Sequence, residues 1–411
     1  MASALFMLQV VSFLDLMSIG LILPQLANHA RTLGFSHVHI GMMGALYSAC
    51  QTISAPIIGS LSDIRGVKPI FLICLAVCSA SYYCLGLASS IVSFFVIRGV
   101  LGSFKQIQLL VKAVVTEYGS DTKEQGVLYG KLIAIASFGM SVGPVISGHV
   151  AEAYPTNAFT ILSFIVGTMF LINTGLISLV PIASKEKKED SKKNIQTAPT
   201  LLQSMINTVK ESVDEFYKVD WPTFWDVFLY KILMALTMGL YFSNFALFLK
   251  TEHNVSSKHL GYIVAFQGVV AGLSNFFIQY FNQLYKNDND YTQRQLHLFI
   301  VMTLCLIGLA SVSDILMYIA ILVPKSICGS VGRVISLEMT TSRSNPAQKG
   351  AIMGVSNSVK SMTGVITPII GGIIAQYIGI RYAFYVAAFV NAIGVAVSYY
   401  KRPKTVKQKI K

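Results

Sequence analysis

Three charged residues lie in stretches of sequence that are otherwise apolar, and their types could do chemistry. Asp15 lies in the first apolar stretch, while Arg98 and Lys105 share a later one. In a membrane-spanning helix such a charge costs about 2.5–3.5 kcal/mol, so it needs an aqueous cavity, a partner or a route to the membrane surface. A desolvated carboxyl group can exchange protons, and cations facing a cavity attract carboxylates or phosphates. These three residues are therefore candidates for proton coupling and solute binding, and we expect Lys105 on roughly the opposite helix face from Arg98.

Other ionisable side chains in apolar stretches have a simpler interpretation. We expect most of the lysines to reach the membrane surface or to pair structurally, as long cationic side chains do. Basic residues outnumber acidic ones in these stretches, which suits an anionic solute. Aromatic residues equally suit an amphipathic organic solute, so both solute classes stay open. The further charged candidates are Lys112, Lys131, Lys231, Lys325, Arg333, Glu338 and Lys360, and the aromatic ones are Tyr47, Phe104, Tyr241 and Phe266.

The apolar stretches are long and numerous enough to cross a membrane many times. The chain has 411 residues, of which 54% are apolar and 12% charged, and its mean hydropathy is +0.61. Because a hydrocarbon core of about 30 Å needs roughly 20 apolar residues per helix, the sequence predicts an all-α polytopic membrane protein embedded in the lipid bilayer. We expect the first stretch to be retained, because no cleavage pattern follows it. The twelve predicted helices span 3–25, 38–60, 69–88, 91–112, 126–150, 158–180, 224–250, 258–282, 294–312, 314–337, 350–376 and 381–400.

The net charge of +13 has a distribution that points to a membrane rather than to nucleic acid. Most of the 32 Lys and Arg residues fall in every second connection and in the C-terminal tail. Cytosolic connections of membrane proteins carry such an excess of positive charge. We therefore expect the N- and C-termini and the long central connection to be cytosolic, and the protein to be a monomer that binds no nucleic acid.

One long polar interruption divides the predicted helices into two sets of six. We therefore predict a first lobe at 1–180, a linker at 181–223, a second lobe at 224–400 and a basic tail at 401–411. Within the linker, apolar residues at 202–217 recur at helical intervals, as in a helix at the membrane interface. A helix packed on the cytosolic faces of the lobes is an equal alternative.

The fifth and eleventh predicted helices share a pattern of small residues and proline. A repeat of this kind implies a pseudo-two-fold axis along the membrane normal and a site between the halves at mid-membrane. Small residues also permit close helix packing, which a moving interface needs as well. The matching positions are Gly126, Gly130, Ser137, Pro144 and Gly148 in the fifth helix, and Gly350, Gly354, Ser361, Pro368 and Gly372 in the eleventh.

The connection between the second and third helices resembles the signature loop of the major facilitator superfamily. That loop reads Gly-x-Leu-x-Asp-x-x-Gly followed by basic residues. The resemblance implies that the acid latches the two lobes on the cytosolic side. Val67 stands where a basic residue is usual, which implies a weaker latch. The gating-loop candidates are Gly59, Asp63, Arg65, Gly66 and Lys68.

Further stretches strengthen this resemblance. Arg98 with Gly102 in the fourth helix and the glycines of the fifth resemble motifs of proton-coupled exporters of the superfamily, although Ser147 replaces the usual Gly. The opening Leu14-Asp15 resembles tetracycline/proton antiporters, whereas Lys105 and the run 241–245 look more like animal orphan members and the organic-cation-transporter-like group. The helix-interface candidates are Gly139, Gly143, Pro144, Gly148, Pro368 and Gly372.

The resemblance implies the major facilitator fold, with twelve transmembrane helices in two six-helix lobes. It also implies a secondary transporter that moves a small organic solute by alternating access, in proton-coupled antiport. Asp15 would then exchange protons or contact the solute, and Arg98 would be its counter-charge or would position the lobes. A receptor or scaffold that keeps the carrier fold without transporting is the alternative.

The sequence argues against an enzyme or an ATP-driven pump. Gly130 and Lys131 are followed by Leu132 inside an apolar helix rather than by the rest of a phosphate-binding loop, and no His-Glu-x-x-His pattern is found. The six cysteines fall in predicted helices without the spacing of a zinc site. We therefore expect no metal and no other cofactor.

Overall fold

The computed structural model describes residues 2–118, 122–181, 217, 219–286, 288, 290–344 and 349–401. Over these residues the regular structure is helical throughout. The linker helix predicted at 202–217 lies outside the described residues, except for its last position. The helices are α1 (Ala2–Thr32), α2 (His37–Arg65), α3 (Val67–Leu87), α4 (Ile91–Phe104), α5 (Ile107–Tyr118), α6 (Thr122–Ala153), α7 (Ala158–Leu179), α9 (Trp221–Glu252), α10 (Ser257–Phe276), α11 (Ile278–Gln283), α12 (Thr292–Ser311), α13 (Ile315–Arg343), α14 (Lys349–Tyr377) and α15 (Ile380–Lys401).

The helices confirm the predicted twelve crossings of a membrane. In the described part of the chain, 10 helical segments are long and apolar enough to span a bilayer, and one of them joins α4 and α5. The remaining two crossings are α2, with 29 residues, and α10, with 20. At about 1.5 Å per residue both are long enough for a hydrocarbon core of about 30 Å.

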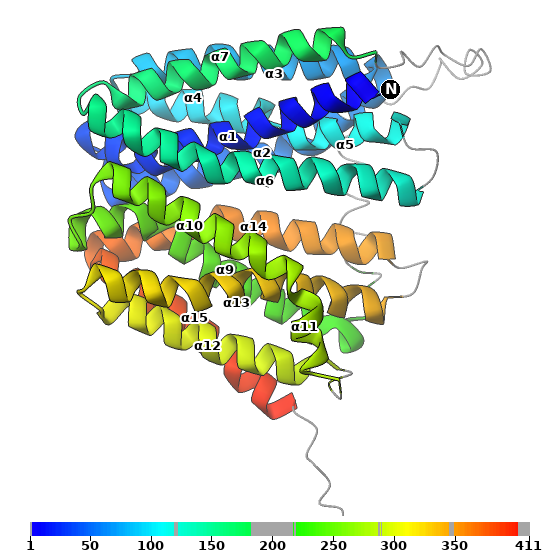
Figure 1. The fold of residues 1–411 in the computed structure, drawn as a ribbon, viewed down its shortest axis with the longest axis vertical. Helices are drawn as coiled ribbons and strands as arrows, with labels where there is room; N and C mark the ends of the chain where they lie inside the picture. The colour runs from blue at the N-terminus through cyan, green and yellow to red at the C-terminus, as the bar shows by residue number, and fades with distance from the viewer. Residues whose placement is uncertain are drawn as a thin grey trace, which may run out of the picture.

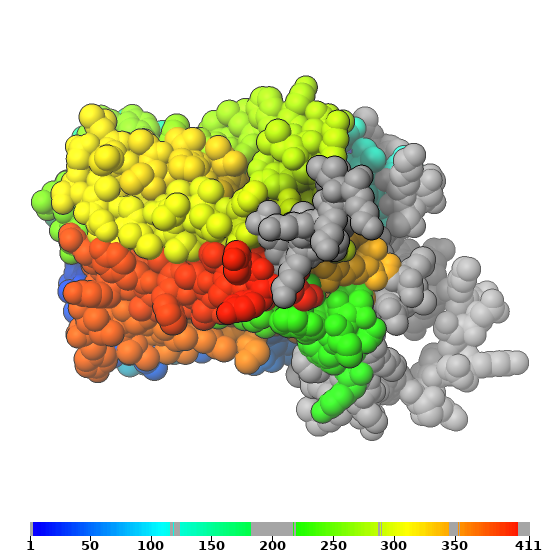
Figure 2. Space-filling view, turned by 90° about the horizontal axis from the view of Figure 1, so that it is seen from below, coloured from blue at the N-terminus to red at the C-terminus, as the bar shows by residue number. Residues whose placement is uncertain are grey.

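The helices form two lobes, as the sequence predicts. Figure 1 shows α1 to α7 stacked as one group above α9 to α15. One apolar core joins buried side chains from Ala4 to Val180, and two further cores join buried side chains from Val219 to Ala388. The outer face of the second lobe carries α12 beside α15 (Figure 2), and these helices expose Leu304 and Phe389, as helices facing lipid do.

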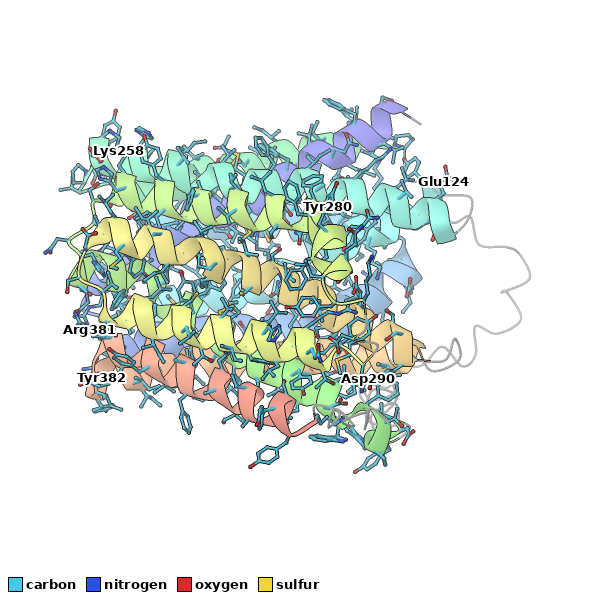
Figure 3. The ribbon with its side chains drawn as sticks, turned by 60° about the horizontal axis from the view of Figure 1, so that its bottom comes forward. Glu124, Lys258, Tyr280, Asp290, Arg381 and Tyr382 are labelled. Atoms are coloured by element: carbon cyan, nitrogen blue, oxygen red, sulfur yellow. The ribbon has the colours of Figure 1, made fainter. Side chains whose placement is uncertain are left out.

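The lobes touch at one end of the bundle and separate at the other. We call the end with Ala2 and Lys401 the terminal side, and the opposite end the distal side. Figure 3 labels Glu124 and Asp290 at the terminal side and Lys258 at the distal side.

Contacts between the lobes lie toward the distal side, where α2 crosses α14 and α6 crosses α10. The helices α6 and α10 then diverge (Figure 1), and near the terminal side a Cβ atom at Gly126 or Gly130 would meet nothing within 4 Å. We call this the terminal-open arrangement.

A buried ion cluster ties three helices of the second lobe together at the terminal side. Asp226 of α9 accepts hydrogen bonds from Arg343 of α13 at 2.9 and 3.0 Å and from Lys401 of α15 at 2.7 Å. The Asp226 side chain is buried, while both cations keep partial contact with solvent. Because removing one partner of a buried pair leaves an uncompensated charge, we assign this cluster a structural role.

Candidate functional site

The site centres on a buried ion pair between α1 and the break after α4. Lys105 Nζ lies 3.0 Å from Asp15 Oδ1 and 3.2 Å from Ser18 Oγ. Gln108 Nε2 donates to the other carboxylate oxygen, Asp15 Oδ2, at 2.8 Å. Asp15 and Lys105 are only 2% and 5% exposed. Both oxygens of Asp15 therefore already have a donor.

The pair depends on an interruption in the fourth membrane crossing. The sequence predicts one crossing over 91–112, but the helix ends at Phe104 and restarts at Ile107. Side chains of α2 and of the break replace the lost helical bonds. Gln51 Nε2 donates to the Lys105 carbonyl at 3.1 Å, and Gln106 Nε2 donates to the Gln51 carbonyl at 2.7 Å. The break is thus held in place, which fixes Lys105 beside α1.

Arg98 does not pair with Asp15 in this structure. Its guanidinium lies 4.3 Å from the centroid of the Tyr47 ring, and it forms no hydrogen bond or ion pair with any described residue. Of the two roles considered for Arg98, counter-charge to Asp15 is therefore wrong for this arrangement, because Lys105 fills it. Lys105 also lies on the same side as Arg98, not opposite, since seven residues make about two turns at 3.6 residues per turn.

A cavity of about 250 Å³ connects these residues. Its polar lining combines Asp15, Lys105 and Arg98 with side chains from α2, α3 and α5. A mostly apolar cavity with a few converging polar groups is typical of a site for a small organic molecule. The remaining lining residues are Leu16, Ile19, Ile22, Leu23, Leu26, Tyr47, Gln51, Tyr82, Gln106, Ile107, Gln108 and Leu109.

The uncharged polar partners in this site were missed from the sequence. Ser18, Gln51, Gln106 and Gln108 complete the hydrogen bonds around the ion pair and the break. Gln106 and Gln108 lie on either side of an apolar residue, in a stretch otherwise rich in Leu and Val. Two amides so close together in an apolar stretch could have indicated a polar site. Polar side chains inside a membrane-spanning segment need partners there.

In the second lobe, Lys325 does not reach the surface and is held by structural contacts instead. It is only 2% exposed, and its Nζ lies 3.3 Å from the centroid of the Tyr241 ring and 4.6 Å from that of Phe242. Gln267 Oε1 accepts from it at 3.4 Å. Lys231 likewise donates to a neutral oxygen, Ser356 Oγ, at 2.7 Å.

The gating loop lies at the terminal side. Asp63 and Arg65 are exposed, and Asp63 forms no ion pair with the described residues. Gly66 has a φ of +91°, a conformation that favours glycine, at the turn from α2 to α3. Lys68 Nζ donates to the carbonyls of Ser178 and Val180 at 2.8 and 2.9 Å, which ties the loop to the end of α7.

The helix-interface candidates divide between two contacts. In the first lobe, α6 packs on α1 at Gly139 and Gly143, where a Cβ at Gly143 would lie 2.6 Å from the Met17 carbonyl oxygen.

Between the lobes, Pro144 and Gly148 of α6 pack on α10, and Pro368 and Gly372 of α14 pack on α2. A Cβ at Gly148 would lie 2.7 Å from the Ser257 carbonyl oxygen. Of the repeated positions, Pro144 and Gly148 with their counterparts Pro368 and Gly372 therefore sit where the lobes meet in the terminal-open arrangement.

Replacing Asp63 by Asn should leave the thermal stability of this arrangement unchanged, because the carboxylate has no ion partner to lose in the described part of the chain. It should raise the share of the terminal-open arrangement if the acid latches the closed one, since a charge-assisted contact is then lost from that state alone. Distances between spin labels at Glu124 and Asp290 measure the balance. The same substitution at exposed Asp314, whose side chain caps α13 within the second lobe, is the control, because Asn caps a helix as well as Asp does. Equal distance distributions for Asp63→Asn and wild type would contradict the latch.

Comparison with known proteins gives the same fold and family. The chain matches the model of the Major Facilitator Superfamily over residues 5–281 and 227–411. Multidrug resistance protein 1 of Bacillus subtilis is 22% identical over 396 residues, covering 94% of this chain and 93% of that protein. Solute carrier family 22 member 18 of Mus musculus is 23% identical over 394 residues, covering 93% and 91%.

A solved structure supports the fold over almost the whole chain. It is that of a bacterial homologue of the human lysosomal transporter Spinster, in an inward-facing and unoccupied conformation. It superposes with a TM-score of 0.73 at 16% identity, covering 97% of this chain and 96% of the other. The chain thus belongs to the major facilitator superfamily and is a multi-pass membrane transporter.

Proposed function

We propose that this protein is a proton-coupled secondary transporter that moves a small organic solute by alternating access. The observation that carries the proposal is the buried pair of Asp15 and Lys105 on the wall of a cavity. Membrane-embedded carboxylates of this kind mark proton relays or solute sites. The similarity to multidrug and solute-carrier proteins supports transport of an organic molecule.

Alternating access requires a second arrangement in which the distal contacts open and the terminal side closes. Backbones approach closely where α2 crosses α14 and where α6 crosses α10. Such interfaces can separate as rigid surfaces. The repeated six-helix lobes supply the two bodies that rock against each other.

Proton binding to the ion pair would change the charge and the hydrogen bonds of the cavity. Protonation of Asp15 removes the charge that holds Lys105, so the hydrogen bonds to Lys105 Nζ and Gln108 Nε2 must rearrange. A proton can drive transport only if it binds the two arrangements with different affinity. Opening and closing of the cavity to water supplies that difference, because desolvation disfavours the charged carboxylate.

The direction of coupling follows from the charge of the solute. Antiport, the mode that the sequence favours, arises when the solute competes with the proton for Asp15, as a cation would. A solute whose binding is strengthened by protonation of Asp15 moves together with the proton instead. The sign of the response to a pH gradient therefore reports how the solute uses Asp15.

The test is flux into proteoliposomes that contain the purified protein, over a panel of organic cations, anions and neutral compounds, with and without a pH gradient. We expect saturable flux of some compounds and acceleration by the gradient. A receptor or scaffold would bind compounds without moving them. Saturable flux that ignores a pH gradient of either sign would refute the coupling.

The connections whose flanking helices end on the terminal side carry most of the Lys and Arg residues of the connections, so we propose that this side is cytosolic. An epitope tag at Lys411 should then be labelled only after the membrane is permeabilised. Asn254, in the Asn-Val-Ser acceptor sequence of the distal connection between α9 and α10, should accept a glycan once a polar spacer lengthens that connection. Labelling of the tag on sealed cells would reverse the orientation.

A further inference from the structure

We propose that the cavity is an organic-anion site, in which Arg98 and the N-terminal end of α5 bind the anionic group. This inference names the solute class of the proposed transporter and rests on that proposed function for its coupling. In this cavity a cation without an acceptor among the described residues, the N-terminal end of a helix and an apolar wall come together.

Arg98 is a buried cation without an acceptor among the described residues. It is 8% exposed, its Nε is enclosed without a hydrogen-bond partner, and no described residue accepts from its other nitrogens. The guanidinium rests on the Tyr47 ring, which supports its charge from one face only. Buried charges in proteins are paired, because an unpaired one is costly. As a lining residue of the cavity, the Arg98 guanidinium is therefore suited to bind a planar anion such as a carboxylate.

Asp15 cannot serve as this missing anion in the observed arrangement. Its two carboxylate oxygens already accept from Lys105 Nζ and Gln108 Nε2. The charged lining of the cavity consists of one acid and two cations, so it carries an excess of positive charge. An organic anion would balance that excess, whereas an organic cation would increase it.

The break before α5 adds a second group of donors. Leu110 N donates to the Gln106 carbonyl at 3.1 Å, but the N–H groups of Ile107, Gln108 and Leu109 have no acceptor among the described residues. The first N–H groups of a helix and its dipole together form an anion-binding end. These same three residues line the cavity with Arg98, so the end of α5 and the guanidinium border one space.

The rest of the wall selects the body of the solute. Side chains of Leu16, Ile19, Ile22, Leu23 and Leu26 form an apolar stripe along α1. An inorganic anion would leave this surface uncovered, whereas an aromatic or aliphatic monocarboxylate covers it. The site therefore fits a carboxylate carried on a small apolar body.

This anion and a proton should strengthen each other's binding. Protonation of Asp15 removes the one negative charge of the cavity and frees Lys105 to approach the bound carboxylate. By linkage, the carboxylate then raises the affinity of Asp15 for a proton by the same factor. Solute and proton consequently move in the same direction, in place of the antiport that the sequence favours.

The experiment measures binding to detergent-purified protein, independently of transport. The probes are benzoate and hexanoate, each compared with its amide and its amine, and binding is read from the shift in thermal unfolding and from titration calorimetry. We expect the carboxylates to bind and the amines not to bind. Arg98→Gln should weaken carboxylate binding by about 10- to 100-fold, and Arg98→Lys, which keeps the charge without the planar donors, should lie between. Arg333→Gln, at an exposed position of α13, is the matched control and should bind as wild type does.

A second measurement needs no variant of Arg98, in case Arg98→Gln fails to fold. Asp15→Asn, which removes the one negative charge of the cavity and frees Lys105, should bind benzoate more tightly than wild-type protein does. Amines that bind as well as carboxylates, full carboxylate binding by folded Arg98→Gln, or no carboxylate binding to wild type would each overturn the site. Gradient-driven flux of cations alone would refute this inference and keep the proposed function. Carboxylate binding that depends on Arg98, without flux of any compound, would support this inference and refute the proposed transport.

Discussion

Proteoliposomes carrying Asp15→Asn should not accumulate solute when a pH gradient is imposed, whereas wild-type protein should. One proton per solute and one pH unit supply about 1.4 kcal/mol, which gives about a tenfold accumulation ratio in the wild type and a ratio of one in the variant. The reason is that Asn cannot exchange a proton at the position held by Lys105 and Gln108. Steady-state solute uptake at fixed gradients measures the ratio.

Two further variants separate coupling from stability. Asp15→Asn leaves Lys105 buried without its counter-charge. The free energy of unfolding of this variant should therefore fall by an amount typical of a broken buried pair, about 3–5 kcal/mol. The double variant Asp15→Asn/Lys105→Gln should recover most of that stability but not the accumulation. Asp226→Asn, in the ion cluster of the second lobe, should lose stability and keep accumulation. A folded Asp15→Asn protein that accumulates solute about tenfold would remove Asp15 from the mechanism.

Gly372→Val should drive the lobes apart at the distal side. A Cβ at this position would lie 2.5 Å from the His37 carbonyl oxygen and 3.3 Å from Gly41 Cα, so backbone rather than a flexible side chain blocks it. Overpacking costs about 1–3 kcal/mol, which changes the ratio of the two arrangements by about 5- to 150-fold. Spin labels at Tyr154 and Tyr382, which are exposed on the distal ends of the two lobes, report the distance.

The matched control is Gly272→Val on α10, where a Cβ would meet nothing within 4 Å in the terminal-open arrangement. It should keep the short distal distance of the wild type. Both variants need the partly accessible Cys50 and Cys84 replaced by Ala first, because free thiols there would also take up label. Folded Gly372→Val with the wild-type distance distribution would show that this crossing is not a moving interface.

The sequence was sufficient for the parts of the fold that depend on local composition. Apolar runs and their polar breaks predicted the two lobes and their twelve crossings, because a bilayer imposes one length on every spanning helix. The Gly66 turn and the glycines of α6 and α14 could also be predicted from the sequence. Tight turns and closely approaching backbones accept few residue types other than glycine.

The candidate site could be predicted only in part. Charge in an apolar stretch identified Asp15, Lys105 and Arg98, which the structure gathers around one cavity. Which cation pairs with Asp15 depends on the helix break after Phe104. No Pro or Gly lies between Phe104 and Ile107 from which that break could be predicted. Hydrogen bonds from α2 hold that break, and such contacts between distant segments leave no trace in local periodicity.

The central claim is that proton and solute use one site that alternates between the two sides of the membrane, and proton movement caused by solute tests it most directly. Proteoliposomes without an imposed gradient, loaded with a pH-sensitive dye, should change their internal pH when a transported solute is added outside. Asp15→Asn should abolish that change while exchange of labelled for unlabelled solute continues. Solute entry into wild-type vesicles without any proton movement would contradict the account.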